Sequence, residues 1–197
     1  DLRADVLEEF QTEATIMASM RSPYIVQLYG ACLESLNYAL VLEYMSLGSL
    51  YDVLKGAKAL DWKLRYSLAL DMGYGLLHLH NKQVIHGDLK SLNVLVNEHY
   101  RAKIADFGMS KVKISSSAAT LYGASSGGST RWMAPEVLIG EGKNTKDSDV
   151  YSYGRILQEL ATRRIPFETT IPRQETFIMA VVMKKLEGKL KEDLPRD

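Results

Sequence analysis

The chain has 197 residues, of which 46% are hydrophobic and 24% are charged, and 24 Lys and Arg residues balance 24 Asp and Glu residues. This composition is typical of a globular domain with a substantial core, and the balanced charge excludes an overall field that attracts nucleic acid or an anionic membrane surface. A single cysteine, Cys32, excludes an internal disulfide, and no uninterrupted apolar run is long enough to span a bilayer. We therefore expect one domain in a reducing compartment, the cytoplasm or the nucleus, without a nucleic-acid partner and without membrane insertion.

The first part of the chain predicts a helix followed by a pair of strands. Residues 6–20 carry apolar side chains at helical spacing with acidic and polar residues between them, which indicates a helix with one buried stripe. Residues 24–32 and 38–44 are short β-branched and aromatic runs on either side of a polar turn at 34–37. This arrangement predicts two antiparallel strands.

Two further helices are predicted next in the chain. Gly48 interrupts the second strand, and Ser49 can cap a helix over residues 50–55. Residues 61–80 form a longer helical pattern, for which Asp61 is a plausible cap. One face of this helix is apolar and is made by Leu64, Leu68, Met72, Leu76 and Leu79.

The second half of the chain predicts two short strands, a loop and two helices. The strands are residues 94–96 and 102–104, with a polar turn between them. Residues 111–129 are rich in Ser, Gly, Ala and Thr and indicate a long loop. Apolar runs at 149–161 and 175–186 predict helices on either side of a stretch that contains proline.

The segment HGDLKSLN before the first of these short strands and the segment IADFG at the second carry the chemistry. They place carboxylates at Asp88 and Asp106, a lysine at Lys90 and an amide at Asn93. Asp88 could orient an acceptor hydroxyl and Lys90 could reach a transferring phosphate, while the oxygens of Asn93 and Asp106 suit Mg²⁺. Taken singly, these residues are common turn formers, but their joint occurrence in this order favours a phosphoryl-transfer site.

With LVLEYM, RWMAPE and SDVYSYG, these motifs make the chain resemble a eukaryotic-type protein kinase, closest to the tyrosine-kinase-like group of serine/threonine kinases. The resemblance implies an α+β, two-lobed fold, with a truncated β-containing N-lobe and hinge at residues 1–45 and an α-helical C-lobe at residues 46–197 that lacks its last helices. It implies transfer of the γ-phosphate of ATP to serine or threonine hydroxyls of a protein substrate, with ATP and Mg²⁺ as cofactors.

The resemblance also implies roles for residues around the nucleotide. Glu13 would pair with a nucleotide-contacting lysine, and Leu42 would be the gatekeeper beside the adenine. Backbone groups of Glu43 and Met45 would meet the adenine edge, and Leu95 would lie under the ring.

Two further expectations concern the support of the site. Asp149, in the SDVYSYG segment, would brace the catalytic loop from a buried helix. A stack of core side chains would link the two lobes through Leu28, Met17, Phe107 and His86.

One departure from the family pattern is Gly87, where most kinases have an arginine that holds a phosphate on the activation segment. We therefore expect activity to depend weakly on phosphorylation of the loop at 111–129. HGD also occurs in small-molecule phosphotransferases of the aminoglycoside and choline kinase type, but DFG, APE and DVYSYG together favour a protein substrate. Lys90 favours serine or threonine as the acceptor. Ser129 stands where this class commonly has a threonine that bonds to the catalytic aspartate, and it keeps the hydroxyl for that role.

A second departure is that the 197 residues contain no G-x-G-x-x-G segment and no lysine before Glu13, since the first lysine is Lys55. The family pattern places these elements upstream of Asp1, and it places the arginine partner of Glu136 after the last residue. We therefore expect a fragment of a longer kinase, with impaired activity by itself. The alternative is a catalytically weak or inactive pseudokinase or scaffold.

Overall fold

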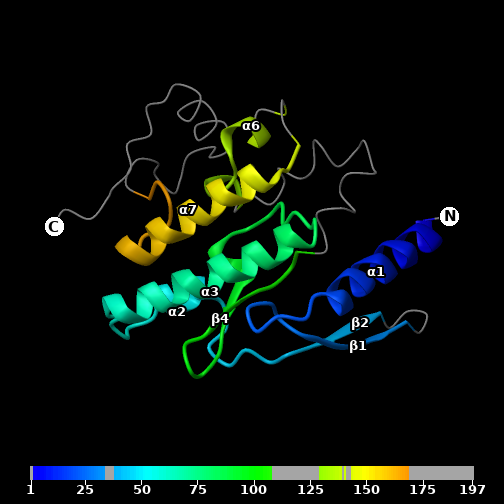
Figure 1. Cartoon of the computed structure of the whole chain (residues 1–197), viewed down its shortest axis with the longest axis horizontal. Coiled ribbons are helices and arrows are strands. Elements are labelled where there is room, and N and C mark those ends of the chain that lie inside the picture. The colour runs from blue at the N-terminus through cyan, green and yellow to red at the C-terminus, as the bar shows by residue number, and fades with distance from the viewer. Residues whose placement is uncertain (1, 34–37, 108–128, 139, 141–142, 169–197) are drawn as a thin grey trace.

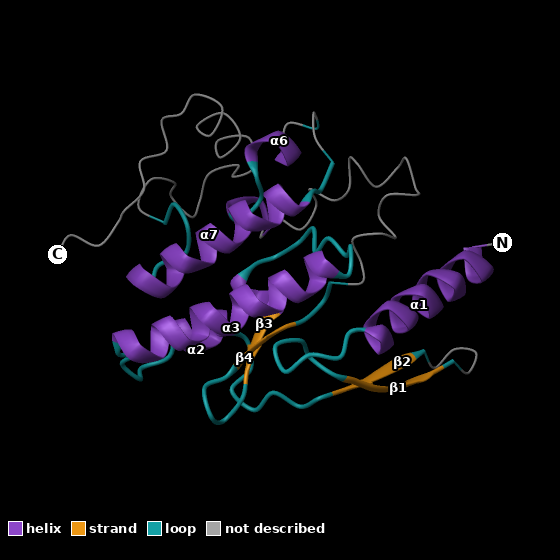
Figure 2. Cartoon of the chain, viewed as in Figure 1, coloured by secondary structure: helices purple, strands orange, loops and turns teal. Residues whose placement is uncertain are grey.

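The computed structural model describes residues 2–33, 38–107, 129–138, 140 and 143–168. Helix α1 and the β1–β2 sheet lie together on one side, and helices α2, α3, α6 and α7 lie on the other (Figure 1). The β3–β4 pair lies between these groups and packs against α3. The strands are few and short beside the helices (Figure 2), so the predicted α+β class is confirmed. The division at residues 45 and 46 stays a prediction.

The first helix and the first sheet are present where the sequence predicted them, but the strands are shorter. Helix α1 is Leu2–Ser19, and strands β1, Leu28–Cys32, and β2, Ala39–Leu42, pair in antiparallel fashion. Residues 24–27 do not pair with β2. Instead, Ile25 bridges to Ile104 of the other sheet, and the Val26 N–H donates to the Ile104 carbonyl at 2.9 Å. The prediction of one strand over 24–32 is therefore wrong in extent, because its first part pairs with the β4 strand.

Both predicted caps start the next two helices. Helix α2 is Leu50–Lys55, and Ser49 forms a reciprocal capping box with Asp52. Helix α3 is Trp62–Asn81, and the Asp61 carboxylate accepts a 2.7 Å hydrogen bond from the Leu64 N–H. The predicted apolar face is confirmed, since Leu68, Met72, Leu76 and Leu79 are buried and Leu64 is half-buried.

Strands β3, Val94–Val96, and β4, Ala102–Ile104, form the predicted antiparallel pair. Helix α3 approaches this pair closely at Gly75, where a Cβ atom would lie 2.8 Å from the Tyr24 carbonyl oxygen and 3.0 Å from Ile104 Cδ1. Only a residue without a side chain fits there without a shift of the backbone.

The last described helices are α6, Pro135–Leu138, and α7, Lys146–Thr162. Helix α7 begins three residues before the predicted start, because Thr145 caps it through a capping box with Ser148. The short helix α6, which begins within the RWMAPE segment, was not predicted. The predicted helix at 175–186 and nearly all of the predicted loop at 111–129 lie outside the described residues.

The main core cluster connects the elements that surround the predicted site. Met17 of α1 and Phe107 are buried in this cluster, and Leu28 packs against it. His86, the fourth member of the predicted stack, is fully buried. Among the described helices, none is long and apolar enough to cross a membrane.

Candidate functional site

Three of the predicted catalytic residues meet in the loop before β3. The Lys90 ammonium lies 2.8 Å from Asp88 Oδ2 and 2.7 Å from Ser129 Oγ. Asn93, at the end of the 3-10 turn Ser91–Asn93, donates from Nδ2 to the Asp88 carbonyl at 2.8 Å. The loop therefore presents a carboxylate and an ammonium, and Ser129, from the separate 3-10 turn Ser129–Arg131, adds a hydroxyl. Among the described residues this hydroxyl bonds to Lys90 and not to Asp88, so the predicted bond to the aspartate is not formed.

Asp106 is connected to this group through the backbone. The Ala105 N–H donates to the Asn93 carbonyl at 2.9 Å, and Asp106 follows directly after Ala105. Asp106 is exposed and has a φ of 56°, a left-handed conformation that Asp adopts more readily than most residues.

The oxygens of Asn93 and Asp106 fit Mg²⁺. Because Asn93 bonds to Asp88 through Nδ2, its Oδ1 is left for a cation. In the part of the chain that the structure describes, no three His, Cys, Asp or Glu residues cluster as a metal site. Mg²⁺ is commonly held by one or two side-chain oxygens together with substrate phosphates and water.

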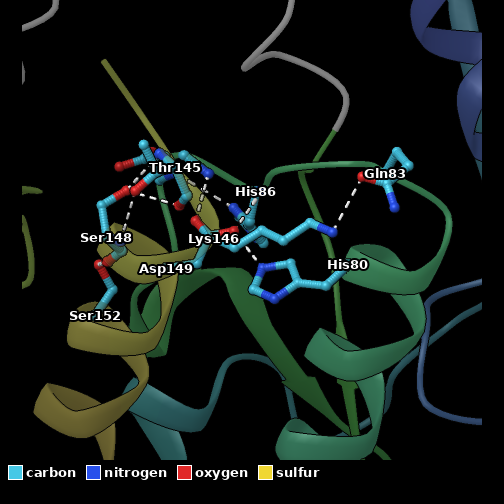
Figure 3. A network of polar contacts seen from close by, with 10 residues as sticks. His80, Gln83, His86, Thr145, Lys146, Ser148, Asp149 and Ser152 are labelled. Carbon is cyan, nitrogen blue, oxygen red and sulfur yellow. Dashed lines mark hydrogen bonds and ion pairs between the residues drawn. The ribbon is translucent and has the colours of Figure 1, made fainter. Parts of the chain in front are cut away.

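Asp149 of α7 supports the loop through hydrogen bonds, as the sequence predicted, and lies next to His86 and His80 (Figure 3). Its two carboxylate oxygens accept hydrogen bonds of 2.8 Å from the N–H groups of His86 and Gly87. His80, on the last turn of α3, lies with Nε2 2.9 Å from Asp149 Oδ2. His80 was not among the predicted residues, because the contact joins residues 69 positions apart.

His86 connects two segments of the site through an uncharged imidazole ring. Burial lowers its pKa below the ordinary value of 6.5, against the opposing influence of Asp149 and Asp88. His86 Nε2 lies 3.0 Å from the Ala105 carbonyl, while Nδ1 accepts from the Asp88 N–H at 3.3 Å. A neutral ring with its proton on Nε2 satisfies both contacts, so His86 joins the HGD loop to the residue before Asp106.

The predicted nucleotide-contacting side chains also come together. Met45 is buried with Val26 and Ala105, and Leu42 and Leu95 pack against these three residues. We call these five residues the Met45 cluster. It brings the end of β2 and the middle of β3 to one apolar surface, as expected of residues that contact an adenine ring from two sides.

The backbone from Glu43 to Met45, next to this cluster, uses only some of its hydrogen-bonding groups within the described part of the protein. The Glu43 N–H donates to the Gln27 carbonyl at 2.8 Å. Within the described residues, the Glu43 carbonyl and the Met45 N–H make no hydrogen bond to the protein. These two groups can therefore form hydrogen bonds with the edge of a bound ligand ring.

Two predicted features remain untested. Glu13 lies on α1, but its side chain is outside the described ones, so its role stays a prediction. The hydroxyl residues of the segment 115–126 are also outside the described residues. Gly87 is described, and its φ of 75° is one that residues with a side chain adopt at a cost.

A buried acid, Glu159 of α7, was not predicted from the sequence. It is 1% exposed, and its carboxylate accepts from Ser91 Oγ at 2.9 Å and from Trp132 Nε1 at 2.6 Å. Burial raises the pKa of Glu159 to about 7. The available signal was a carboxylate in the middle of the apolar run 156–161.

Comparison with known proteins agrees with this geometry. The chain matches the family model described as protein tyrosine and serine/threonine kinase over residues 2–193. The chain belongs to this protein kinase family. The match is to a protein kinase family, so it favours a protein kinase over a small-molecule phosphotransferase.

Several relatives of this kinase chain are serine/threonine kinases by name. The chain is 43% identical to serine/threonine-protein kinase CTR1 of Arabidopsis thaliana over 192 residues. This aligned region covers 95% of the chain and 23% of CTR1. The chain is 38% identical over 198 residues to serine/threonine-protein kinase STY17 of the same plant, covering 99% of this chain and 33% of that protein. The chain thus spans between 23% and 33% of the length of these two relatives. The predicted resemblance to the tyrosine-kinase-like group is confirmed.

Proposed function

We propose that the protein containing this chain transfers the γ-phosphate of ATP to serine or threonine hydroxyls of protein substrates. The observation that carries the proposal is the position of the Lys90 ammonium, which bonds to both Asp88 Oδ2 and Ser129 Oγ. This contact holds a carboxylate and a cation side by side where the two partners of phosphoryl transfer, an acceptor hydroxyl and a phosphate, would meet.

Asp88 would orient the acceptor hydroxyl and take up its proton. Its side chain is 31% exposed, so a substrate can reach it although Lys90 holds one oxygen. In the transfer, the acceptor oxygen forms a bond to the γ-phosphorus while the bond from that phosphorus to the ADP oxygen breaks. The hydroxyl proton passes to Asp88.

Lys90 would stabilise the charge that builds up on the transferring phosphoryl group. Its side chain is 15% exposed, and this partial burial strengthens the interaction of its charge with a phosphate oxygen. Mg²⁺ held by Asn93 and Asp106 would supply further neutralisation of the phosphate oxygens.

The Met45 cluster would hold the adenine ring. Leu42 and Leu95 would contact the ring faces, and the free Glu43 carbonyl and Met45 N–H would form hydrogen bonds with its edge. Glu13 would pair with a nucleotide-contacting lysine, as the family pattern implies. The names of the relatives and the presence of Lys90 support serine and threonine as acceptors.

The test compares the full-length protein that contains this chain with its Asp88→Asn variant, using ATP, Mg²⁺ and a library of serine, threonine and tyrosine peptides. We expect phosphate on serine and threonine, and a loss of about 10²–10⁴-fold in kcat in Asp88→Asn, because the base is removed while the shape is kept. Asp147→Asn is the matched control, since Asp147 is an exposed residue in the first turn of α7.

Two outcomes would contradict the proposal. Transfer of phosphate that stays at the background level in both the protein and its Asp88→Asn variant would indicate that the chain serves as a scaffold. Phosphorylation of an aminoglycoside or choline without phosphorylation of any peptide would indicate a small-molecule phosphotransferase.

A further inference from the structure

An ion pair between Lys103 and Glu43 joins the two sheets beside the proposed base-binding surface. Lys103 Nζ lies 2.6 Å from Glu43 Oε1 and 2.8 Å from Oε2, so both carboxylate oxygens are engaged. The side chains of Lys103 and Glu43 are 15% and 21% exposed. Such partial burial shields a pair from solvent screening and makes its geometry better defined than that of a surface pair.

The two partners come from different sheets. Glu43 directly follows β2, which pairs with β1, whereas Lys103 is the central residue of β4, which pairs with β3. Three residues after Lys103, the chain reaches Asp106. The pair therefore connects the segment that would bind the base to the strand that delivers a proposed Mg²⁺ ligand.

A third segment takes part in the same contact. The Gln27 N–H donates to Glu43 Oε2 at 3.2 Å, and the Glu43 N–H donates back to the Gln27 carbonyl at 2.8 Å. The neighbouring Val26 is bonded through its N–H to the Ile104 carbonyl. Glu43 is thus bonded to Gln27 through its backbone N–H and through one carboxylate oxygen, and both of its carboxylate oxygens also contact Lys103.

The contact lies next to the Met45 cluster. In that cluster, Val26 directly precedes Gln27 and Leu42 directly precedes Glu43. Ala105 of the cluster lies two residues after Lys103. A change in the Glu43–Lys103 distance would shift these side chains relative to one another and would turn the hinge backbone.

We propose that Lys103 is a positioning residue for ATP: by pairing with Glu43 it fixes the hinge edge against the strand that carries Asp106, and so sets the affinity for the nucleotide. The inference rests on the proposed function, because it assigns the adenine to the Met45 cluster. Lys103 itself would not touch the substrate.

The test measures ATP affinity by calorimetry in the full-length protein that contains this chain, in an Asp88→Asn background so that no turnover occurs. Steady-state kinetics are measured in the same variants with Asp88 present. We expect Lys103→Met to weaken ATP binding at least fivefold and to raise the KM for ATP by a larger factor than any fall in kcat. Lys103→Arg should restore affinity to within twofold, because a guanidinium can pair with both carboxylate oxygens.

Arg101→Met is the matched control for a merely structural effect. Arg101 directly precedes β4 and also forms a two-point ion pair, at 2.8 and 2.6 Å, but its partner is Asp71 of α3. We expect this variant to lower Tm while ATP affinity stays within twofold.

The inference is overturned if Lys103→Met leaves ATP affinity within twofold, if it changes Tm alone as Arg101→Met does, or if Lys103→Arg fails to restore binding. These results would leave the proposed function standing, because the parent protein would still bind ATP and phosphorylate peptides. A parent protein that neither binds ATP nor transfers phosphate would overturn the proposed function and the inference together.

Discussion

Trp132 Nε1 donates a 2.6 Å hydrogen bond to Oε2 of Glu159, a carboxylate that is almost completely buried in α7. The other oxygen of Glu159 accepts from Ser91 Oγ in the catalytic loop. One buried acid therefore connects the loop that holds Asp88 to the RWMAPE segment that holds Trp132.

The free energy of unfolding should fall as pH rises because of Glu159. Its pKa is about 7 in the folded protein, above the ordinary value of 4.5 that applies to the unfolded chain, so between these values the folded state binds more protons than the unfolded state. This contribution is fully present below pH 4.5, declines through the interval, and is lost above pH 7, a change of about 3 kcal/mol. Urea unfolding from pH 4 to pH 8 measures it.

Glu159→Gln isolates this contribution from those of other groups. Gln can accept from Trp132 and donate to Ser91, so the contacts are kept while the titration is removed. We expect the difference in stability between the two proteins to change with pH in the stated direction. A pH-independent difference would show that Glu159 titrates normally.

Gly75→Ala should destabilise the fold. The new methyl group would lie 2.8 Å from the Tyr24 carbonyl oxygen, so α3 or the β4 strand must shift, at a cost of about 1–3 kcal/mol. Gly154→Ala in α7 is the matched control, because a Cβ there has nothing within 4 Å. That change should raise stability by up to about 1 kcal/mol through helix propensity. Chemical denaturation measures both, and equal effects of the two changes would refute the close approach.

Asp149→Asn should lower kcat more than it raises the KM for ATP. An amide can accept only through one atom, so one of the N–H groups of His86 and Gly87 loses its partner and the loop shifts. The cost of an unsatisfied group, about 1–3 kcal/mol, corresponds to a loss of roughly 10- to 100-fold. Steady-state kinetics check this, and an unchanged kcat would show that Asp149 does not position the loop.

Activity should depend weakly on phosphorylation of the loop because Gly87 offers no guanidinium for a phosphate. Alanine at Ser115, Ser116, Ser117, Thr120, Ser125 and Ser126, with phenylalanine at Tyr122, should leave kcat within a few-fold. Phosphatase treatment should have an equally small effect. Abolished turnover in either experiment would contradict the prediction.

Local signals in the sequence were enough for most helices and for the outline of the site. Ser49 and Asp61 start α2 and α3 as predicted, because a cap satisfies N–H groups only two or three residues away. Asp88, Lys90 and Asn93 were predicted from spacing within one loop, and the loop itself brings them together.

Tertiary structure alone decided the contacts that join distant segments. Residues 24–26 pair with β4 and not with β2, Lys103 reaches Glu43 across 60 positions, and Glu159 meets Ser91 across 68. No residue pattern within a short window specifies such a partner, because it depends on how helices and sheets pack. The sequence by itself thus determined the family and which residues of the HGDLKSLN loop lie together, whereas packing determined how that loop, the Glu43 segment and α7 are held against one another.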